Sequence, residues 1–170
     1  MKSNSLHILK GLLYVSFIIS LLTALGSLGI AAYIAFIGDM NFDESNFSFL
    51  FPIQTNKAAI SLFLLGFALY SAIGLIVYLM LKIIRSFEKG NLFTNYQIAG
   101  FNLIGQLIIW LTILQSAAEF ILSLVFKSRI EFKLEVSGFW LLIALGAFFI
   151  VLSKVFLQAK KLKEENELAI

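Results

Sequence analysis

The sequence predicts an all-α integral membrane protein, a bundle of four transmembrane helices. Four long stretches, residues 11–38, 58–81, 98–118 and 136–153, contain no Asp, Glu, Lys, Arg or His. About 20 apolar residues of helix cross the hydrocarbon core of a bilayer. The chain is 60% hydrophobic and only 14% charged, whereas a soluble domain is about 25% charged. Residues 62–65 read Leu-Phe-Leu-Leu without alternation, which favours helices over barrel strands.

The four spans are expected at about 11–37, 58–81, 96–120 and 136–154, in a single domain covering residues 1–170 with a charged tail at 155–170. The first span follows Lys2 and Lys10, as the apolar part of a signal peptide would. It is much longer than the 7–15 residues typical of such a segment. We therefore expect it to be an uncleaved first span.

The two loops at the ends of the first and third spans show strand-like patterns. Residues 129–136 alternate polar and apolar side chains, and residues 47–51 are aromatic and precede Pro52. Such patterns are typical of β-strands. We expect that these two outer loops could form a small extracellular β pairing over the end of the bundle.

The distribution of Lys and Arg predicts the orientation in the membrane. Nine of the 13 lie on the side of the two termini and the second loop, namely Lys2, Lys10, Lys82, Arg85, Lys89, Lys154, Lys160, Lys161 and Lys163. Cytoplasmic loops carry the excess of basic residues. Both termini are therefore expected in the cytoplasm, near anionic lipid headgroups rather than nucleic acid.

The second loop has the signals of a well-defined helix–turn–helix connection. The second helix is expected to continue to about Glu88, with Gly90 in the left-handed conformation after its end. Thr94 and Gln97 form the pattern of a capping box. The third helix is therefore expected to begin at about Asn95.

The same loop permits two interpretations. Phe93 and Ile98 occupy the positions of a hydrophobic staple, which suits a connection with a purely structural role. Alternatively, the loop is a docking site for a cytoplasmic partner, with Phe87 and Phe93 as apolar anchors beside Gly90 and Thr94.

A polar stripe runs along the outer half of the third span. Its members recur at spacings of three and four and so share one helix face: Thr112, Gln115, Ser116 and Glu119. Ionisable residues in spans are candidates for function. The stripe either joins helices through hydrogen bonds or lines an outward-facing vestibule for an ion or small ligand.

The tail combines an amphipathic pattern with a separation of charge. Lys160, Lys161 and Lys163 lie nearest the membrane and are followed by acidic residues. Basic residues favour anionic lipid, and acidic residues further out favour a basic partner. The candidate partner-binding residues of the tail are Glu164, Glu165, Glu167, Leu168 and Ile170. A solvated charged end with no partner is the alternative.

No residue pattern in the chain indicates an enzyme. There is no cysteine and a single histidine, His7, which leaves no thiol chemistry and no histidine pair for a metal or a triad. No phosphate-binding glycine loop, HExxH or GxSxG motif occurs. We therefore expect no catalytic residues, cofactor or metal.

Two motifs resemble those of a small bacterial membrane family, domain of unknown function 2975, which includes YoaS-like proteins. One is Phe87-x-x-Gly90-x-x-Phe93-Thr94 followed by Gly105, and the other is the ending LKEENELAI at residues 162–170. The resemblance implies four spans over the whole chain. In that family the gene often lies beside one for a small helix-turn-helix regulator, which implies such a regulator as partner.

Two hypotheses about function follow. The first is a non-enzymatic protein of the bacterial cytoplasmic (inner) membrane that senses or tethers through a cytoplasmic partner such as a small helix-turn-helix regulator. The second is a homo-oligomeric transporter or channel subunit for an ion or small molecule, built around the polar stripe.

The predicted orientation can be tested with introduced thiols, because the chain has no cysteine of its own. Single cysteines at Ser3, Asn46 and Lys163 would be treated in intact cells with a membrane-impermeant thiol reagent. Only the cysteine at position 46 should react. Reaction at position 3 or 163 would contradict the orientation.

Overall fold

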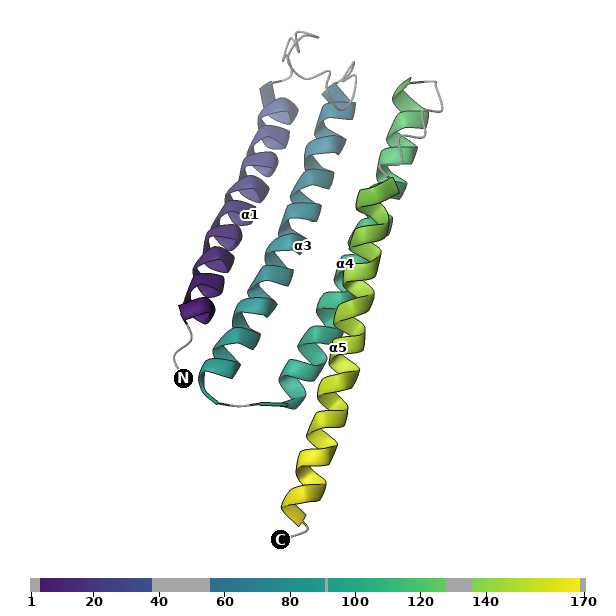
Figure 1. The fold of residues 1–170 in the computed structure, drawn as a ribbon. Coiled ribbons are helices and arrows are strands. Elements are labelled where there is room, and N and C mark those ends of the chain that lie inside the picture. The colour runs from purple at the N-terminus through teal and green to yellow at the C-terminus, as the bar shows by residue number, and fades with distance from the viewer. Residues whose placement is uncertain (1–3, 38–55, 91, 128–135, 169–170) are drawn as a thin grey trace.

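The protein consists of four long helices in the computed structural model, which describes residues 4–37, 56–90, 92–127 and 136–168 (Figure 1). They are α1 (Asn4–Ile37), α3 (Asn56–Glu88), α4 (Asn95–Lys127) and α5 (Val136–Leu168). All four are long and apolar enough to cross a membrane, so the predicted all-helical membrane architecture is confirmed. The proposed β pairing lies outside the described residues.

The helices are arranged as two antiparallel pairs. α1 lies against α3, α5 lies against α4, and α3 meets α4 (Figure 1). Among the described residues, no Cα atom of α1 lies within 8 Å of one in α4 or α5. The four spans therefore form two helical hairpins joined through α3 and α4, which is a more open arrangement than a closed bundle.

One end of the molecule carries both the start of α1 and the end of α5, together with the turn between α3 and α4 (Figure 1). We call it the turn end. The last part of α5 extends beyond this turn and beyond the other helices (Figure 1). The helix continues to Leu168, so most of the charged tail belongs to α5.

Small residues allow the paired helices to approach closely. A Cβ atom added at Gly105 of α4 would lie 2.5 Å from the carbonyl oxygen of Gly146 in α5. One added at Gly146 would lie 2.8 Å from the carbonyl oxygen of Gly105. Between α1 and α3, the Ser20 hydroxyl lies 3.2 Å from the position that a Gly74 Cβ would take. Such close approaches provide van der Waals contact in lipid, where apolar side chains gain little from burial.

Most large apolar side chains on the helices are exposed, as expected for a surface solvated by lipid. Phe36 of α1 is 90% exposed and Leu141 of α5 is 69% exposed. The buried polar side chains are satisfied: no buried side-chain nitrogen or oxygen in the described residues lacks a hydrogen-bond partner. The polar side chains buried between the described helices are therefore paired within the chain.

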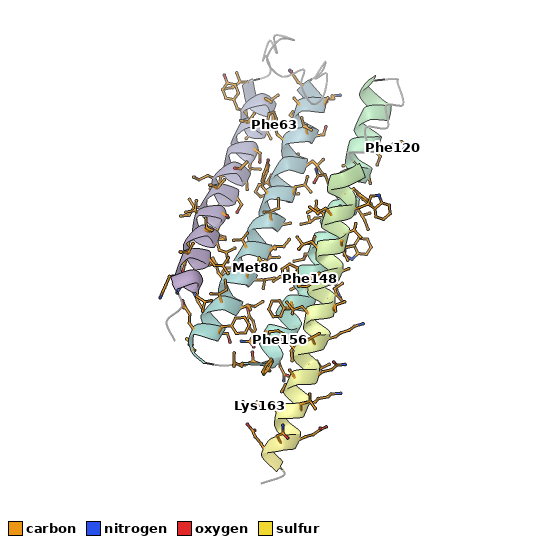
Figure 2. The ribbon with its side chains drawn as sticks, viewed as in Figure 1. Phe63, Met80, Phe120, Phe148, Phe156 and Lys163 are labelled. Carbon is orange, nitrogen blue, oxygen red and sulfur yellow. The ribbon has the colours of Figure 1, made fainter. Side chains whose placement is uncertain are left out.

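The main apolar cluster lies where α3, α4 and α5 come together towards the turn end. Its buried centre is Ile83, Phe101 and Ile104, and Phe149 and Phe156 of α5 pack against it. Figure 2 shows Phe156 near the level of the turn and Lys163 on the part of α5 beyond it. This cluster fixes the position of the turn relative to the tail.

Candidate functional site

The α3–α4 turn has the backbone conformation that its sequence predicts at Gly90. The Gly90 N–H donates to the carbonyl of Phe87 at 3.0 Å, and Gly90 has a φ of 75°. Phe93 also has a positive φ, 59°, which costs an L residue about 1–2 kcal/mol. The turn therefore includes a strained position that the sequence pattern did not predict.

The predicted capping box is present at the start of α4. The Thr94 N–H donates to the side-chain oxygen of Gln97 at 3.0 Å, and the Gln97 N–H donates to the Thr94 hydroxyl oxygen at 3.3 Å. The predicted start of the helix at Asn95 is confirmed.

Gln97 also joins the two hairpins. Its side chain is completely buried, and its amide nitrogen donates to the hydroxyl oxygen of Ser86 in α3 at 3.0 Å. One side chain therefore caps α4 and binds α4 to the end of α3. The sequence indicated the first role but not the second, because the second depends on a residue of another helix.

Four phenylalanines pack together between the turn and α5. The ring centroid of Phe156 lies 6.0 Å from that of Phe87, 5.3 Å from that of Phe93 and 5.0 Å from that of Phe101. The two predicted anchors, Phe87 and Phe93, are half-buried and contact α5 of their own chain. Their packing accounts for the unusual backbone at Phe93, since it brings that ring onto Phe156.

Two hydrogen bonds reinforce the contact between α4 and α5. The buried Ser153 hydroxyl donates to the carbonyl of Ile98 at 2.8 Å. The Lys160 ammonium donates to the side-chain oxygen of Asn95 at 2.8 Å. Both acceptors lie in the first turn of α4, so α5 is held to the turn end from Ser153 to Lys160.

Beyond Lys160 the tail is an exposed helix. Residues 161–167 are all exposed, and Leu162 is 60% exposed. Lys160 pairs with Glu164 at 3.3 Å and Lys163 pairs with Glu167 at 3.7 Å. Such i,i+4 pairs contribute about 0.3–0.5 kcal/mol each, so they support the helix while leaving its surface open.

Three of the predicted tail residues, Glu164, Glu165 and Glu167, lie on this exposed helix. Leu168 is the last residue of α5, but its side chain lies outside what the structure describes, as does all of Ile170.

The basic residues at the end of α3 make contacts with neighbouring helices. Lys10 of α1 forms an ion pair with Glu88 at 2.7 Å, and Arg85 donates a hydrogen bond to the hydroxyl of Tyr14. The ammonium of Lys82 lies 5.1 Å from the ring centroid of Tyr78 and 5.8 Å from that of Tyr96 in α4. The start of α1 is thereby attached to the same end of the molecule.

The polar stripe of α4 is only partly open. The buried Thr112 hydroxyl donates to the carbonyl of Ile108 at 2.7 Å, within the same helix. Ser116 is half-buried, and Gln115 is exposed but has a contact within the chain. The Glu119 side chain lies outside the described part of the structure. The stripe therefore includes at least one hydroxyl used inside its own helix.

A shallow groove of about 400 Å³ lies between α1 and α3, away from the polar stripe. It is lined mainly by apolar and aromatic side chains, among them Phe17, Phe67 and Tyr70. Over the described ranges, no group of three or more His, Cys, Asp or Glu is placed to hold a metal ion.

The fold and the turn define a multi-pass membrane protein in which a helical tail is fixed to a capped turn. The model of the family described as "Protein of unknown function (DUF2975)" matches residues 44–170. The chain belongs to this family, as its turn and tail motifs indicated. Searches of curated proteins and of solved structures gave no match.

Several contacts that organise this site were not predicted from the sequence. Ser153 was expected only as the end of a span, and its bond to Ile98 joins residues far apart in the chain. Gly105 was predicted only as part of a motif. In the structure its backbone lies close to that of Gly146 in α5, which explains why this position is a glycine. A search for small and polar residues at matching depths on adjacent spans could have suggested both pairs.

Gln97 should contribute more to stability than the capping box alone requires. Thr94→Ala removes one capping bond and should cost about 1 kcal/mol. Gln97→Leu leaves the half-buried Thr94 N–H and Ser86 hydroxyl without their partner, at about 1 kcal/mol or more for each group. In detergent, the melting temperature should fall further for Gln97→Leu than for Thr94→Ala.

The matched control is Gln158→Leu, because Gln158 is exposed on α5. This variant should melt close to the parent. If Gln97→Leu melts no lower than Gln158→Leu, then Gln97 does not join the hairpins.

Proposed function

We propose that this protein is a non-enzymatic docking protein of the bacterial cytoplasmic membrane, which senses or tethers through a cytoplasmic partner bound to the tail of α5. The observation that carries the proposal is the continuation of α5 past the turn as an exposed, charged helix. The start of this tail is attached to the turn by the ring of Phe156 and by the hydrogen bond of Lys160 to Asn95, which gives the exposed part a defined position.

The proposed orientation has the turn end facing the cytoplasm. The described basic side chains at this end include Lys82, Arg85, Lys89 and Lys154. An excess of basic residues next to spans is typical of the cytoplasmic side. In this orientation the lysines nearest the span contact anionic headgroups, and the acidic part of the tail lies further from the membrane.

The charge order of the tail supports a basic partner. Glu164, Glu165 and Glu167 are exposed at the far end of α5, and Leu162 adds an exposed apolar side chain. DNA-binding proteins carry basic surfaces, and a cluster of carboxylates increases the rate at which such a surface associates. A small helix-turn-helix regulator therefore fits the tail by charge as well as by the family resemblance.

The attachment of the tail suggests how a change in the membrane could reach the partner. α5 contacts α4 along the span at Gly146 and at the turn through Phe156 and Ser153. A shift of α5 against α4 would therefore move the exposed part of the helix. In this proposal, the position of the tail depends on how α4 and α5 pack against each other in the membrane.

An oligomeric transporter or channel subunit receives less support. Such a subunit would line a path with the polar stripe of α4, and the Thr112 hydroxyl is buried and bonded within its own helix. We keep this function as an alternative that rests on Gln115 and Glu119.

Partner binding should depend on the tail and on its carboxylates. The tagged full chain and a variant lacking residues 162–170 would be purified from native membranes, and co-purifying proteins identified by mass spectrometry. A small basic regulator should be recovered with the full chain and be absent from the truncated one. Both forms should remain monodisperse in detergent, because residues 161–167 do not pack against the spans.

The contribution of the tail carboxylates to binding is tested with the purified regulator. Replacing Glu164, Glu165 and Glu167 by Gln should weaken binding roughly tenfold, at about 0.5 kcal/mol for each exposed charge. It should also reduce the salt dependence of binding. Lys161→Gln with Lys163→Gln is the matched control and should bind at least as well as the parent. Recovery of the same proteins with the truncated chain would refute the proposed function.

A further inference from the structure

One face of α4 has none of the other described helices against it and carries a regular pattern. Ile104 and Ile108 point towards the packed side, and the residues on the opposite side are exposed. The spacing of these exposed residues alternates between four and three, which is the a/d repeat of a coiled-coil seam. We call them the α4 seam: Ala99, Leu103, Gln106, Trp110, Ile113 and Ala117.

Gln106 is a polar side chain at the middle of this apolar seam. The membrane-spanning part of α4 runs from Asn95 to Ala118, so Gln106 is about 17 Å of helix from either end. Gln106 is exposed and has no side-chain hydrogen bond in the described structure. This contrasts with Gln97 on the same helix, whose amide is buried and bonded.

An unbonded amide in the hydrocarbon core is costly, because lipid chains offer neither a donor nor an acceptor. Trp110 lies one turn further along the seam, is 62% exposed, and its indole N–H also lacks a partner among the described residues. Two polar groups on one lipid-facing stripe at mid-depth indicate that the stripe is covered by something able to form hydrogen bonds.

We propose that the α4 seam pairs with the α4 seam of a second copy of this chain. All copies insert with the same orientation, so a two-fold axis relating them must lie along the membrane normal. That symmetry places each residue opposite its equivalent at the same depth. Gln106 then meets Gln106 of the second copy, and an amide, having both a donor and an acceptor, is complementary to itself.

The residues of the α4 seam fit the same seam of a second copy better than they fit a helix of another protein. A repeat that averages 3.5 residues supports left-handed packing of two parallel helices, and a polar side chain at one such position fixes their register. Ala99 and Ala117 allow the helix backbones to approach at both ends of the seam. The pairing leaves the tail of α5 free, and it does not depend on the proposed cytoplasmic partner.

Disulfide cross-linking in the native membrane tests the pairing directly, because the chain has no cysteine of its own. Ile113→Cys on the seam should form a dimer of two copies under mild oxidation. Leu114→Cys is the matched control: it has the same depth and is 55% exposed, but points about 100° away. Equal cross-linking at both positions would show random collision and overturn the proposal.

The contribution of the amide is measured by energy transfer between labelled copies of the full chain in liposomes over a range of protein-to-lipid ratios. Gln106→Leu should raise the dissociation constant of the dimer about three- to twenty-fold, whereas Gln106→Asn should restore most of the pairing. Gln106→Leu should keep the parent's helical circular dichroism, because the side chain is exposed and its amide makes no hydrogen bond among the described residues.

Three results would overturn the proposal. One is an unchanged dissociation constant in Gln106→Leu. Another is the absence of energy transfer at every protein-to-lipid ratio. The third is a cross-linked product in native membranes whose mass does not match two copies and which the purified chain cannot form in liposomes. That product would mean that a helix of a different protein covers the seam.

Discussion

The side chain of Gln97 is the contact on which the arrangement of the two hairpins most depends. α1 packs on α3 and α5 packs on α4, and among the described residues the helix backbones of the two hairpins approach each other only where α3 meets α4. At that point a completely buried amide caps α4 and bonds to Ser86 of α3. In lipid, where apolar burial favours one helix pair little over another, a saturated polar contact is what specifies the pairing.

The remaining architecture follows from this constraint. α3, the turn, α4 and α5 form a connected unit, and the family match over residues 44–170 covers this unit. α1 lies outside the match, and within the described residues it is attached to the unit through α3, by close approach at Gly74 and by the ion pair of Lys10 with Glu88. The open arrangement leaves wide lipid-facing surfaces among the described residues, and the α4 seam, with the amide of Gln106 at its middle, is one of them.

Local features were predictable from the sequence because their causes are local. The length of the uncharged stretches predicts the spans. The capping box and the left-handed conformation of Gly90 are predicted by residues that lie close together in the sequence. The left-handed backbone of Phe93 and the ring cluster around Phe156 were not predicted, because both arise when Phe156, far along the chain in α5, packs on the turn. Gln106 was not singled out from the sequence, because it lies on a different face of α4 from the polar stripe that ends at Glu119.

The tail of α5 is held against the α3–α4 turn as far as Lys160, and the exposed helix beyond it therefore has a fixed direction relative to the turn. The most direct measurement is the distribution of distances between spin labels at Leu92 in the turn and Leu162 on the tail, both exposed, in liposomes with an excess of unlabelled protein. The parent should give one narrow distribution. Phe156→Ala, which removes the ring shared by Phe87, Phe93 and Phe101, should broaden it, whereas Phe148→Ala, at an exposed position on the same helix, should not. A distribution in Phe156→Ala as narrow as that of the parent would contradict the account.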